Sequence, residues 1–367
     1  MRILTIIGAR PQFVKAAAVS RAIRFHGNII ETIVHTGQHF DTNMSDVFFE
    51  QMDIPRPDYY LKIASLSHGA MTGRMLEGIE VLIQQERPDW VLVYGDTNST
   101  LAGALAAAKL CIPIAHVEAG LRSHNPAMPE EINRVLTDRV SSLLLCPTET
   151  AVNNLKKEGF PNRTIGKRQQ QVVNVGDVMF DAVLYYRERA LKEINLQTFG
   201  LEHQRYALCT IHRQENTDKI DRIKSILGAL QSIAKDLTVV LPLHPRTKAK
   251  ITQYNLANFL KGLCLLDPLP YLEIQRLQMS AKVILTDSGG IQKEAYFHRV
   301  PCITLRDETE WLETVESEWN QLAGASKEKI INSYLIDTKR RESNGKYYGN
   351  GKASYKILDR LVDYKSN

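Results

Sequence analysis

This chain of 367 residues lacks several features that define other protein classes. Its five cysteines form no Cys-x-x-Cys pair, which argues against a metal site and favours reduced thiols in a cytoplasmic protein. No apolar run is long enough to span a bilayer, and the run after Met1 is too short for a signal peptide. The formal net charge is only +5, with the basic residues spread along the chain. We therefore expect a cytoplasmic protein that binds neither membrane nor nucleic acid.

Short apolar runs alternate with longer helical patterns along the whole chain. The runs lack the period-two alternation of half-exposed strands, so we expect parallel strands that are covered by helices on both faces. The length and the repeated strand–helix alternation together predict an α/β fold with two Rossmann-like, doubly wound domains. The expected strands are residues 3–7, 29–35, 90–94, 112–117, 143–146, 172–175, 206–211, 237–243, 263–266, 283–285 and 302–305.

The alternation is interrupted once, near the middle of the chain. Pro161, Gly166 and the polar residues 167–171 separate two halves that are alike in pattern but not in sequence. We therefore place the N-terminal domain at residues 1–170 and the C-terminal domain at residues 171–350. Residues 351–367 read as a final helical segment.

Polar clusters directly follow several of the apolar runs in the first half, where open α/β sheets bind their ligands. Arg10 and Lys15 lie at the start of the helix after the first run and could meet an anion, or could be ordinary solvated bases. Asp96 and Glu130 could serve chemistry, or could simply open helices. Glu118 ends an apolar run, where a carboxylate must be paired, protonated or functional.

The second half carries groups that suit a nucleotide diphosphate. His212 lies in a concentrated polar group at a strand end, although a hydrogen-bonded loop histidine is the commoner fate of this residue type. Ser288-Gly289-Gly290, between a strand and a helix, offers backbone N–H groups to a pyrophosphate. Glu294 follows on the same helix and could bind ribose hydroxyls. The chain has neither a Gly-x-Gly-x-x-Gly fingerprint nor a metal-ligand spacing, so we predict no cofactor and no metal.

Seven motifs, in order along nearly the whole chain, resemble those of the non-hydrolysing UDP-N-acetylglucosamine 2-epimerases. They are Gly8-Ala9-Arg10-Pro11, Thr36-Gly37-Gln38-His39, Gly95-Asp96-Thr97, His116-Val117-Glu118-Ala119-Gly120-Leu121-Arg122, Pro129-Glu130-Glu131-Ile132-Asn133-Arg134, His212-Arg213-Gln214-Glu215-Asn216 and Asp287-Ser288-Gly289-Gly290-Ile291-Gln292-Lys293-Glu294.

The resemblance implies an isomerase with the GT-B architecture, in which the active site lies in the cleft between the two domains and the last helix returns to the first. It implies a homodimer that needs neither a metal nor a nicotinamide cofactor. The residues that it implies for the UDP-sugar are Arg10, Arg134, His212, Ser288, Gly289, Gly290 and Glu294. The residues that it implies around the reacting carbon are Lys15, Asp96, Glu118, Glu130 and His212.

The implied reaction inverts C2 of the sugar. A base removes the C2 proton while UDP leaves from C1, and UDP then adds back with a proton delivered to the other face of the resulting 2-acetamidoglucal. Asp96, Glu118 and Glu130 are the candidates for the two acid–base groups, in an order that the sequence leaves open. His212 would stabilise the departing diphosphate.

Two departures indicate a particular branch of this family. Trp311 stands where the commonest members have an arginine, and residues 67–74 and 309–311 look like the branch acting on UDP-2,3-diacetamido-2,3-dideoxyglucuronate. That branch would supply a manno-configured donor for surface polysaccharide. Gln38-His39-Phe40-Asp41 also differs from the Gln-His-Arg-Gln run of the family's regulatory pocket. The alternatives are a GT-B glycosyltransferase with a UDP-sugar donor, a UDP-sugar sensor and a hydrolysing epimerase.

Overall fold

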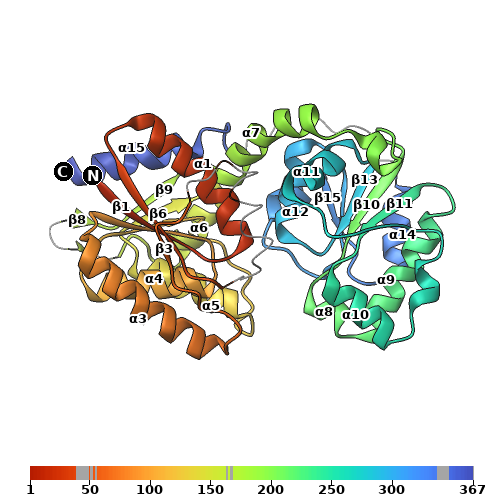
Figure 1. Cartoon of the computed structure of the whole chain (residues 1–367), viewed down its shortest axis with the longest axis horizontal. Helices are drawn as coiled ribbons and strands as arrows, with labels where there is room; N and C mark the ends of the chain where they lie inside the picture. The colour runs from red at the N-terminus through yellow and green to blue at the C-terminus, as the bar shows by residue number, and fades with distance from the viewer. Residues whose placement is uncertain are drawn as a thin grey trace. The chain divides into compact units, whose positions relative to one another are not determined.

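A computed structural model describes residues 1–38, 49, 53, 56–162, 164–165, 168–336 and 347–366. The chain divides into two compact units (Figure 1). The first unit comprises Met1–Leu184 and Lys346–Asn367, and the second comprises Tyr185–Gly345. Each unit has its own sheet and its own core, and each is described separately below.

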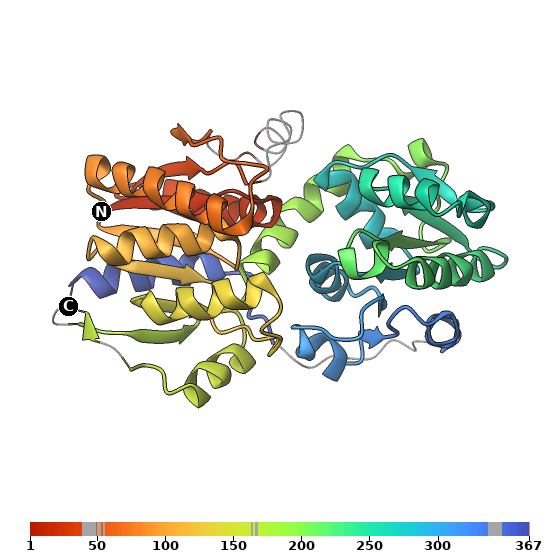
Figure 2. The same ribbon diagram turned by 90° about the horizontal axis from the view of Figure 1, so that it is seen from below.

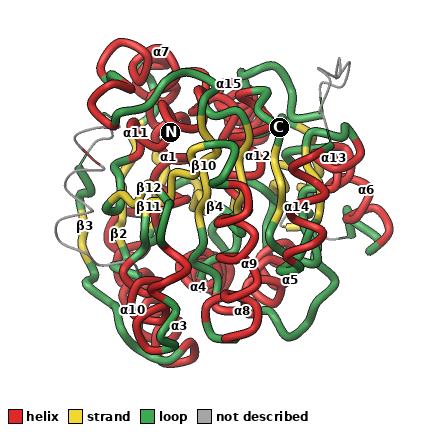
Figure 3. Tube along the Cα trace, turned by 90° about the vertical axis from the view of Figure 1, so that its right-hand side faces the viewer, coloured by secondary structure: helices red, strands yellow, loops and turns green. Residues whose placement is uncertain are grey.

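The sheet of the first unit has seven strands in the order β3-β2-β1-β4-β5-β6-β9, and every neighbouring pair is parallel. Figure 3 shows β3 and β2 next to each other at the edge of this sheet. A two-stranded antiparallel hairpin, β7–β8, stands apart from it. The strands are β1 (Arg2–Ile7), β2 (Ile30–His35), β3 (Tyr59–Tyr60), β4 (Trp90–Tyr94), β5 (Ile114–Val117), β6 (Leu143–Cys146), β7 (Thr164–Ile165), β8 (Arg168–Gln169) and β9 (Gln171–Asn174).

Helices cover this sheet. Three of them, α3, α4 and α5, lie side by side (Figure 2). The last helix of the chain, α15, lies beside α1 in the first unit (Figure 1), and the Tyr364 ring packs edge-on against Trp90 of β4 at 4.9 Å. The helices are α1 (Arg10–His26), α3 (His68–Glu86), α4 (Asn98–Lys109), α5 (Pro129–Val140), α6 (Glu149–Lys157), α7 (Val178–Glu193), which continues into the second unit, and α15 (Ala353–Ser366).

The second unit repeats the doubly wound plan with six parallel strands in the order β12-β11-β10-β13-β14-β15. The strands are β10 (Tyr206–Thr210), β11 (Thr238–Pro242), β12 (Cys264–Leu266), β13 (Val283–Thr286), β14 (Cys302–Thr304) and β15 (Asn320–Leu322). The helices are η1 (Leu196–Phe199), α8 (Gln214–Thr217), α9 (Ile220–Ile233), α10 (Pro245–Gln253), η2 (Ala257–Leu260), α11 (Tyr271–Ser280), α12 (Gly289–His298), α13 (Leu312–Glu316) and α14 (Lys327–Leu335).

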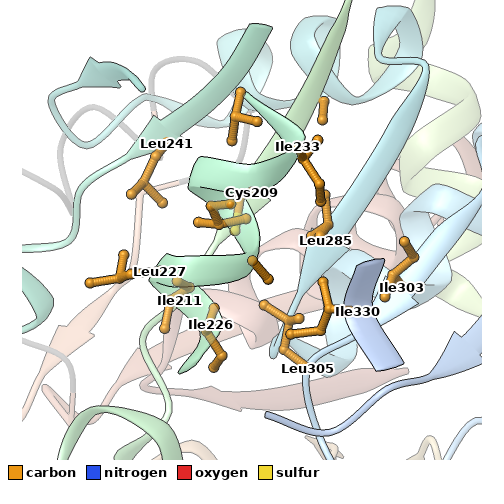
Figure 4. Packing of buried hydrophobic residues seen from close by; sticks show 14 of the residues in the cluster. Cys209, Ile211, Ile226, Leu227, Ile233, Leu241, Leu285, Ile303, Leu305 and Ile330 are labelled. Atoms are coloured by element: carbon orange, nitrogen blue, oxygen red, sulfur yellow. The ribbon is translucent and has the colours of Figure 1, made fainter. Parts of the chain in front are cut away.

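Apolar residues on the strands of the second unit pack against apolar residues of its helices. Cys209 and Leu285 of the central strands lie in one cluster with Ile226 and Ile233 of α9 and Ile330 of α14 (Figure 4). A second cluster contains Leu208 and Ile284, their sequence neighbours, which point to the other face of the sheet. Burial on both faces explains why the strands read as continuous apolar runs rather than as alternating ones.

The predicted α/β class with two Rossmann-like domains of the GT-B type is confirmed. The unit boundary differs from the one drawn at residues 170 and 171, because strand β9 pairs with β6 and so completes the first sheet. The chain changes unit within α7, between Leu184 and Tyr185. The active-site cleft between the domains stays a prediction. In the part of the chain that the structure describes, no helix is long and apolar enough to cross a membrane.

Replacing Leu285 by Ala tests the core of the second unit. Leu285 is fully buried in the central strand β13, so we expect the free energy of unfolding to fall by about 2–5 kcal/mol in urea denaturation. Leu265→Ala is the matched control, because this leucine of β12 is 43% exposed and its loss should cost about 0.5 kcal/mol. Equal effects of the two substitutions would contradict this description of the core.

Candidate functional site

In each unit the strand order reverses once, next to the first strand. The reversal lies between β1 and β4 in the first unit and between β10 and β13 in the second. Open α/β sheets bind ligands beyond the carboxyl ends of the strands at such a point, because the crossovers on its two sides diverge there. The polar clusters that the sequence singled out follow these strands and their neighbour β5.

A buried ion pair occupies this position in the first unit. Lys15 Nζ, on the second turn of α1, lies 2.7 Å from Glu118 Oε2, just beyond β5, and less than a tenth of either side chain is exposed. The backbone of Glu118 is left-handed, with φ 72°, a strained conformation for this residue type. Gly95 leaves room for the pair, because a Cβ there would lie 3.3 Å from Lys15 Nζ.

A second group of charges joins the turn after β4 to helix α5. Arg134 pairs through one nitrogen with Asp96 Oδ2 and through the other with Glu131 Oε2, at 2.7 Å for the latter. Burial raises the pKa of Glu131, but the backbone N–H of Ser123 and the Arg134 charge outweigh it and lower the pKa. Glu131 therefore stabilises the loop before α5. Its neighbour Glu130 is half-buried, and no hydrogen bond or ion pair joins its side chain to the described residues.

Behind these groups lies a fully buried histidine that the sequence analysis did not single out as a site residue. His116 Nδ1 lies 2.7 Å from Asp138 Oδ1, and Nε2 lies 2.8 Å from the carbonyl oxygen of Gly95. Arg122 donates to Asp138 Oδ2 at 2.7 Å and also pairs with Glu158. Burial raises the pKa of Asp138, but the hydrogen bond from His116 and the charges of His116 and Arg122 outweigh it, so the pKa is lowered.

The second unit places an oriented histidine at its reversal point. His212 Nδ1 lies 3.0 Å from Oδ1 of the buried Asp287, while 43% of the His212 side chain is exposed. Asp287 also accepts hydrogen bonds from the backbone N–H groups of His212 and Arg213 and from the amide of Asn216. Burial raises the pKa of Asp287, but these donors, with His212 first, lower it. Asp287 thus fixes the ring of a half-exposed imidazole.

The glycine turn lies at the N-terminus of α12. Ser288 caps this helix by accepting from the backbone N–H of Ile291, and Gly289 and Gly290 are its first two residues. A Cβ on Gly289 would lie 2.7 Å from Glu310 Oε1 and 3.2 Å from Trp311 Nε1, so a larger residue would displace both side chains. The two glycines place no side chain of their own at the start of α12, and the N-terminus of a helix favours an anion.

Glu294 lies further along α12, where only 4% of it is exposed. Gln278 donates to Glu294 Oε2 at 2.6 Å and the Tyr271 hydroxyl donates to Oε1 at 3.3 Å, both from α11. The carboxylate is held in one orientation by these two donors. The sequence placed Glu294 on this helix but gave no sign of its partners.

Trp311 is part of the packing around α12. Its ring is almost fully buried and lies under the ammonium of Lys293, which is 3.8 Å from the ring centroid. The adjacent Glu310 pairs with the buried Arg306 at 3.0 Å. Trp311 therefore packs beside Gly289 and binds the Lys293 ammonium through a cation–π contact.

The family model for UDP-N-acetylglucosamine 2-epimerase matches residues 21–362. The chain is 52% identical to UDP-2,3-diacetamido-2,3-dideoxy-D-glucuronate 2-epimerase of Pseudomonas aeruginosa, over 99% of each chain. The chain belongs to the UDP-N-acetylglucosamine 2-epimerase family. The Methanocaldococcus jannaschii UDP-GlcNAc 2-epimerase, solved with UDP-GlcNAc and UDP, superposes with a TM-score of 0.89 at 44% identity, covering 99% of this chain and 100% of that one.

A more distant epimerase has the same fold. The Neisseria meningitidis UDP-GlcNAc 2-epimerase bound to UDP-GlcNAc gives a TM-score of 0.88 at 32% identity, covering 99% of this chain and 100% of that one. The prediction of an isomerase of this family is thereby confirmed, and the predicted branch agrees with the Pseudomonas relative.

The roles predicted for single residues of this epimerase-family chain stay predictions. The structure places the Lys15–Glu118 pair against Gly95, whose sequence neighbour Asp96 pairs with Arg134. It places Arg134 between two carboxylates. The Arg10 side chain lies outside the described residues, as do residues 39–41 of the run that differs from the family's regulatory pocket.

Replacing Asp287 by Asn tests the buried carboxylate. The substitution replaces one accepting carboxylate oxygen by an NH2 group, which donates. We therefore expect the free energy of unfolding to fall by about 2–3 kcal/mol near neutral pH. Because the pKa of Asp287 is lowered from 3.8, its stabilisation is present above pH 3.8 and is lost as the pH falls through the folded-state value. Urea denaturation as a function of pH should show the two proteins converging in acid. Asp236→Asn, at an exposed position, is the control. If its stability also converged with that of the wild type in acid, the pH dependence could not be assigned to Asp287.

Proposed function

We propose that this chain is a non-hydrolysing UDP-sugar 2-epimerase that converts UDP-2,3-diacetamido-2,3-dideoxyglucuronate to its manno epimer. UDP is eliminated across C1 and C2 and then adds back. The observation that carries the proposal is the buried Lys15–Glu118 pair beside Asp96 at the strand reversal of the first unit. The Pseudomonas relative, which is named for this reaction and matches the chain over nearly its whole length, supports the choice of sugar.

The first unit would supply proton transfer. Elimination needs a base for the C2 proton, and addition of UDP needs an acid on the opposite face of the sugar. Glu118 and Asp96 flank Gly95, and each has a cation beside it, Lys15 or Arg134, which compensates its charge. Glu130, half-buried on the first turn of α5, is the third candidate. We assign the base and the acid, on opposite faces of the sugar, to two of these three carboxylates.

The second unit would hold UDP. The backbone N–H groups of Gly289 and Gly290, at the N-terminus of α12 after the Ser288 cap, suit the diphosphate. His212, oriented by Asp287, would donate to the diphosphate as its negative charge grows during departure from C1. Glu294, fixed by its two donors on α11, would accept from the ribose hydroxyls. Arg10 and Arg134 complete the set assigned to the UDP-sugar.

We also propose a cellular setting. The manno-configured UDP-sugar would be a donor for surface polysaccharide, and the chain would act as a cytoplasmic homodimer, as its resemblance to the family implies.

Proton NMR in deuterated buffer tests the reaction, with UDP-2,3-diacetamido-2,3-dideoxyglucuronate and UDP-GlcNAc in separate tubes. We expect loss of the C2 proton signal and growth of the manno epimer in the first tube, without any acceptor. Turnover of UDP-GlcNAc alone, or of both sugars equally, would overturn the choice of substrate. Silence in both tubes would overturn the epimerase and favour a glycosyltransferase, which needs an acceptor.

Replacing Glu118 by Gln tests proton transfer by the first unit. The amide keeps the size of the carboxylate but cannot accept the C2 proton, so kcat should fall by about 100-fold or more. The affinity for UDP, measured by calorimetry, should change little, because the groups assigned to UDP in the second unit are intact. Glu149→Gln, an exposed carboxylate of α6, is the control. A kcat within about threefold of the wild type would exclude Glu118 from proton transfer.

A further inference from the structure

His116 is fully buried in β5, yet it lies in contact with two oxygen atoms rather than with apolar side chains alone. The carbonyl oxygen of Gly95 can only accept, so the Nε2 atom beside it must carry a hydrogen. The Asp138 carboxylate lies beside Nδ1. Because Asp138 also accepts from Arg122 and from the backbone N–H of Gly120, its second oxygen is already supplied with two donors.

The groups around the ring favour two donating nitrogens. Arg122 bridges the buried Asp138 to Glu158, a 27% exposed side chain that also pairs with Arg139 at 3.8 Å. Asp138 Oδ2 accepts from Arg122 and Gly120, and Oδ1 lies 2.7 Å from His116 Nδ1. A buried carboxylate oxygen needs a donor, and a ring nitrogen without its hydrogen would turn a lone pair toward it.

The two contacts of the ring lead to the two parts of the proposed proton-transfer site. Asp138 is on α5, the helix whose first turns carry Glu130 and Arg134. Gly95 begins the turn that carries Asp96, and the backbone N–H of Gly95 donates to Val117, next to His116 in β5. The Asp96–Arg134 ion pair also joins this turn to α5. The ring is therefore one buried connection between α5 and the turn after β4, next to Asn133 of α5, whose amide donates to the Asp96 carbonyl oxygen.

We propose that His116 is a positioning residue of the epimerase, which donates hydrogen bonds from both ring nitrogens and thereby fixes the Gly95–Asp96 turn relative to α5. The inference rests on the proposed function, because the groups that it positions are those assigned to C2 proton transfer. A small displacement of such groups costs about 100-fold in rate even when the replaced residue does not touch the substrate.

A pair of substitutions separates the two contacts. The amide of His116→Asn reaches the position of Nδ1 and can donate to Asp138, but it does not reach Gly95. The amide of His116→Gln reaches the position of Nε2 and can donate to Gly95, but it leaves Asp138 with one donor fewer. Each variant keeps one contact and loses the other, so the link between α5 and the Gly95–Asp96 turn is broken in both. We therefore expect kcat to fall by about 100-fold in both variants, with KM within about threefold of the wild type.

A third variant controls for loss of stability. Asp181 is buried in the first unit and accepts from the backbone of Ala353 and Ser354, at the start of α15. Asp181→Asn should lower the melting temperature as the His116 variants do, yet keep the wild-type kcat. If either His116 variant keeps the wild-type kcat, the positioning role is overturned. If the wild type itself does not exchange the C2 proton, the proposed function has failed instead.

Nitrogen-15 NMR of histidine-labelled protein gives a readout that is independent of activity. The resonances missing from His116→Gln identify the ring in the wild-type spectrum. We expect the chemical shifts of both ring nitrogens at neutral pH to be those of protonated nitrogen. A shift typical of an unprotonated nitrogen at either position would overturn the inference that both donate.

Discussion

Parallel strands of an open sheet end at one edge, and in both units the strand order reverses beside the first strand of the sheet. This topological constraint determines which loops can meet. The loops after β1, β4 and β5 converge in the first unit, and those after β10 and β13 converge in the second. Residues that are far apart in sequence, such as Lys15 and Glu118, become partners for this reason alone. The ion pairs and hydrogen bonds of the site then stabilise the charged side chains that this edge brings together.

Each of the buried carboxylates at these edges has donors that compensate its desolvation. Glu118 has Lys15, Asp138 has His116 and Arg122, and Asp287 has its set of donors around His212. A carboxylate without such partners would be neutralised or would destabilise the fold. The same ion pairs fix the side chains in one geometry, which proton transfer to and from a sugar carbon requires. The strained backbone of Glu118 is tolerated within this framework.

The sequence predicted the strands of the two large sheets except β3 and β15, and the positions of the polar clusters, because both are local. Apolar runs such as residues 143–146 are visible in any short window, and a glycine turn after a run is equally local. It could not predict that Glu131 rather than Glu130 pairs with Arg134, since the choice depends on where α5 meets the loop before it. It also did not find the partners of His116 and His212, which lie 22 and 75 residues away. The two-residue strand β3 is too short to produce a pattern.

Positional isotope exchange tests most directly whether inversion at C2 proceeds through departure of UDP. The UDP-sugar substrate carries oxygen-18 at the oxygen that bridges C1 and the β-phosphorus. Elimination breaks the bond from C1 to this oxygen, and phosphorus NMR follows the label during turnover. Cleavage of that bond frees the β-phosphate to rotate, so the account predicts that the label spreads to the non-bridging oxygens as the manno epimer forms. Formation of the epimer with the label confined to the bridge would contradict elimination, and with it the roles assigned to His212 and to the N-terminus of α12.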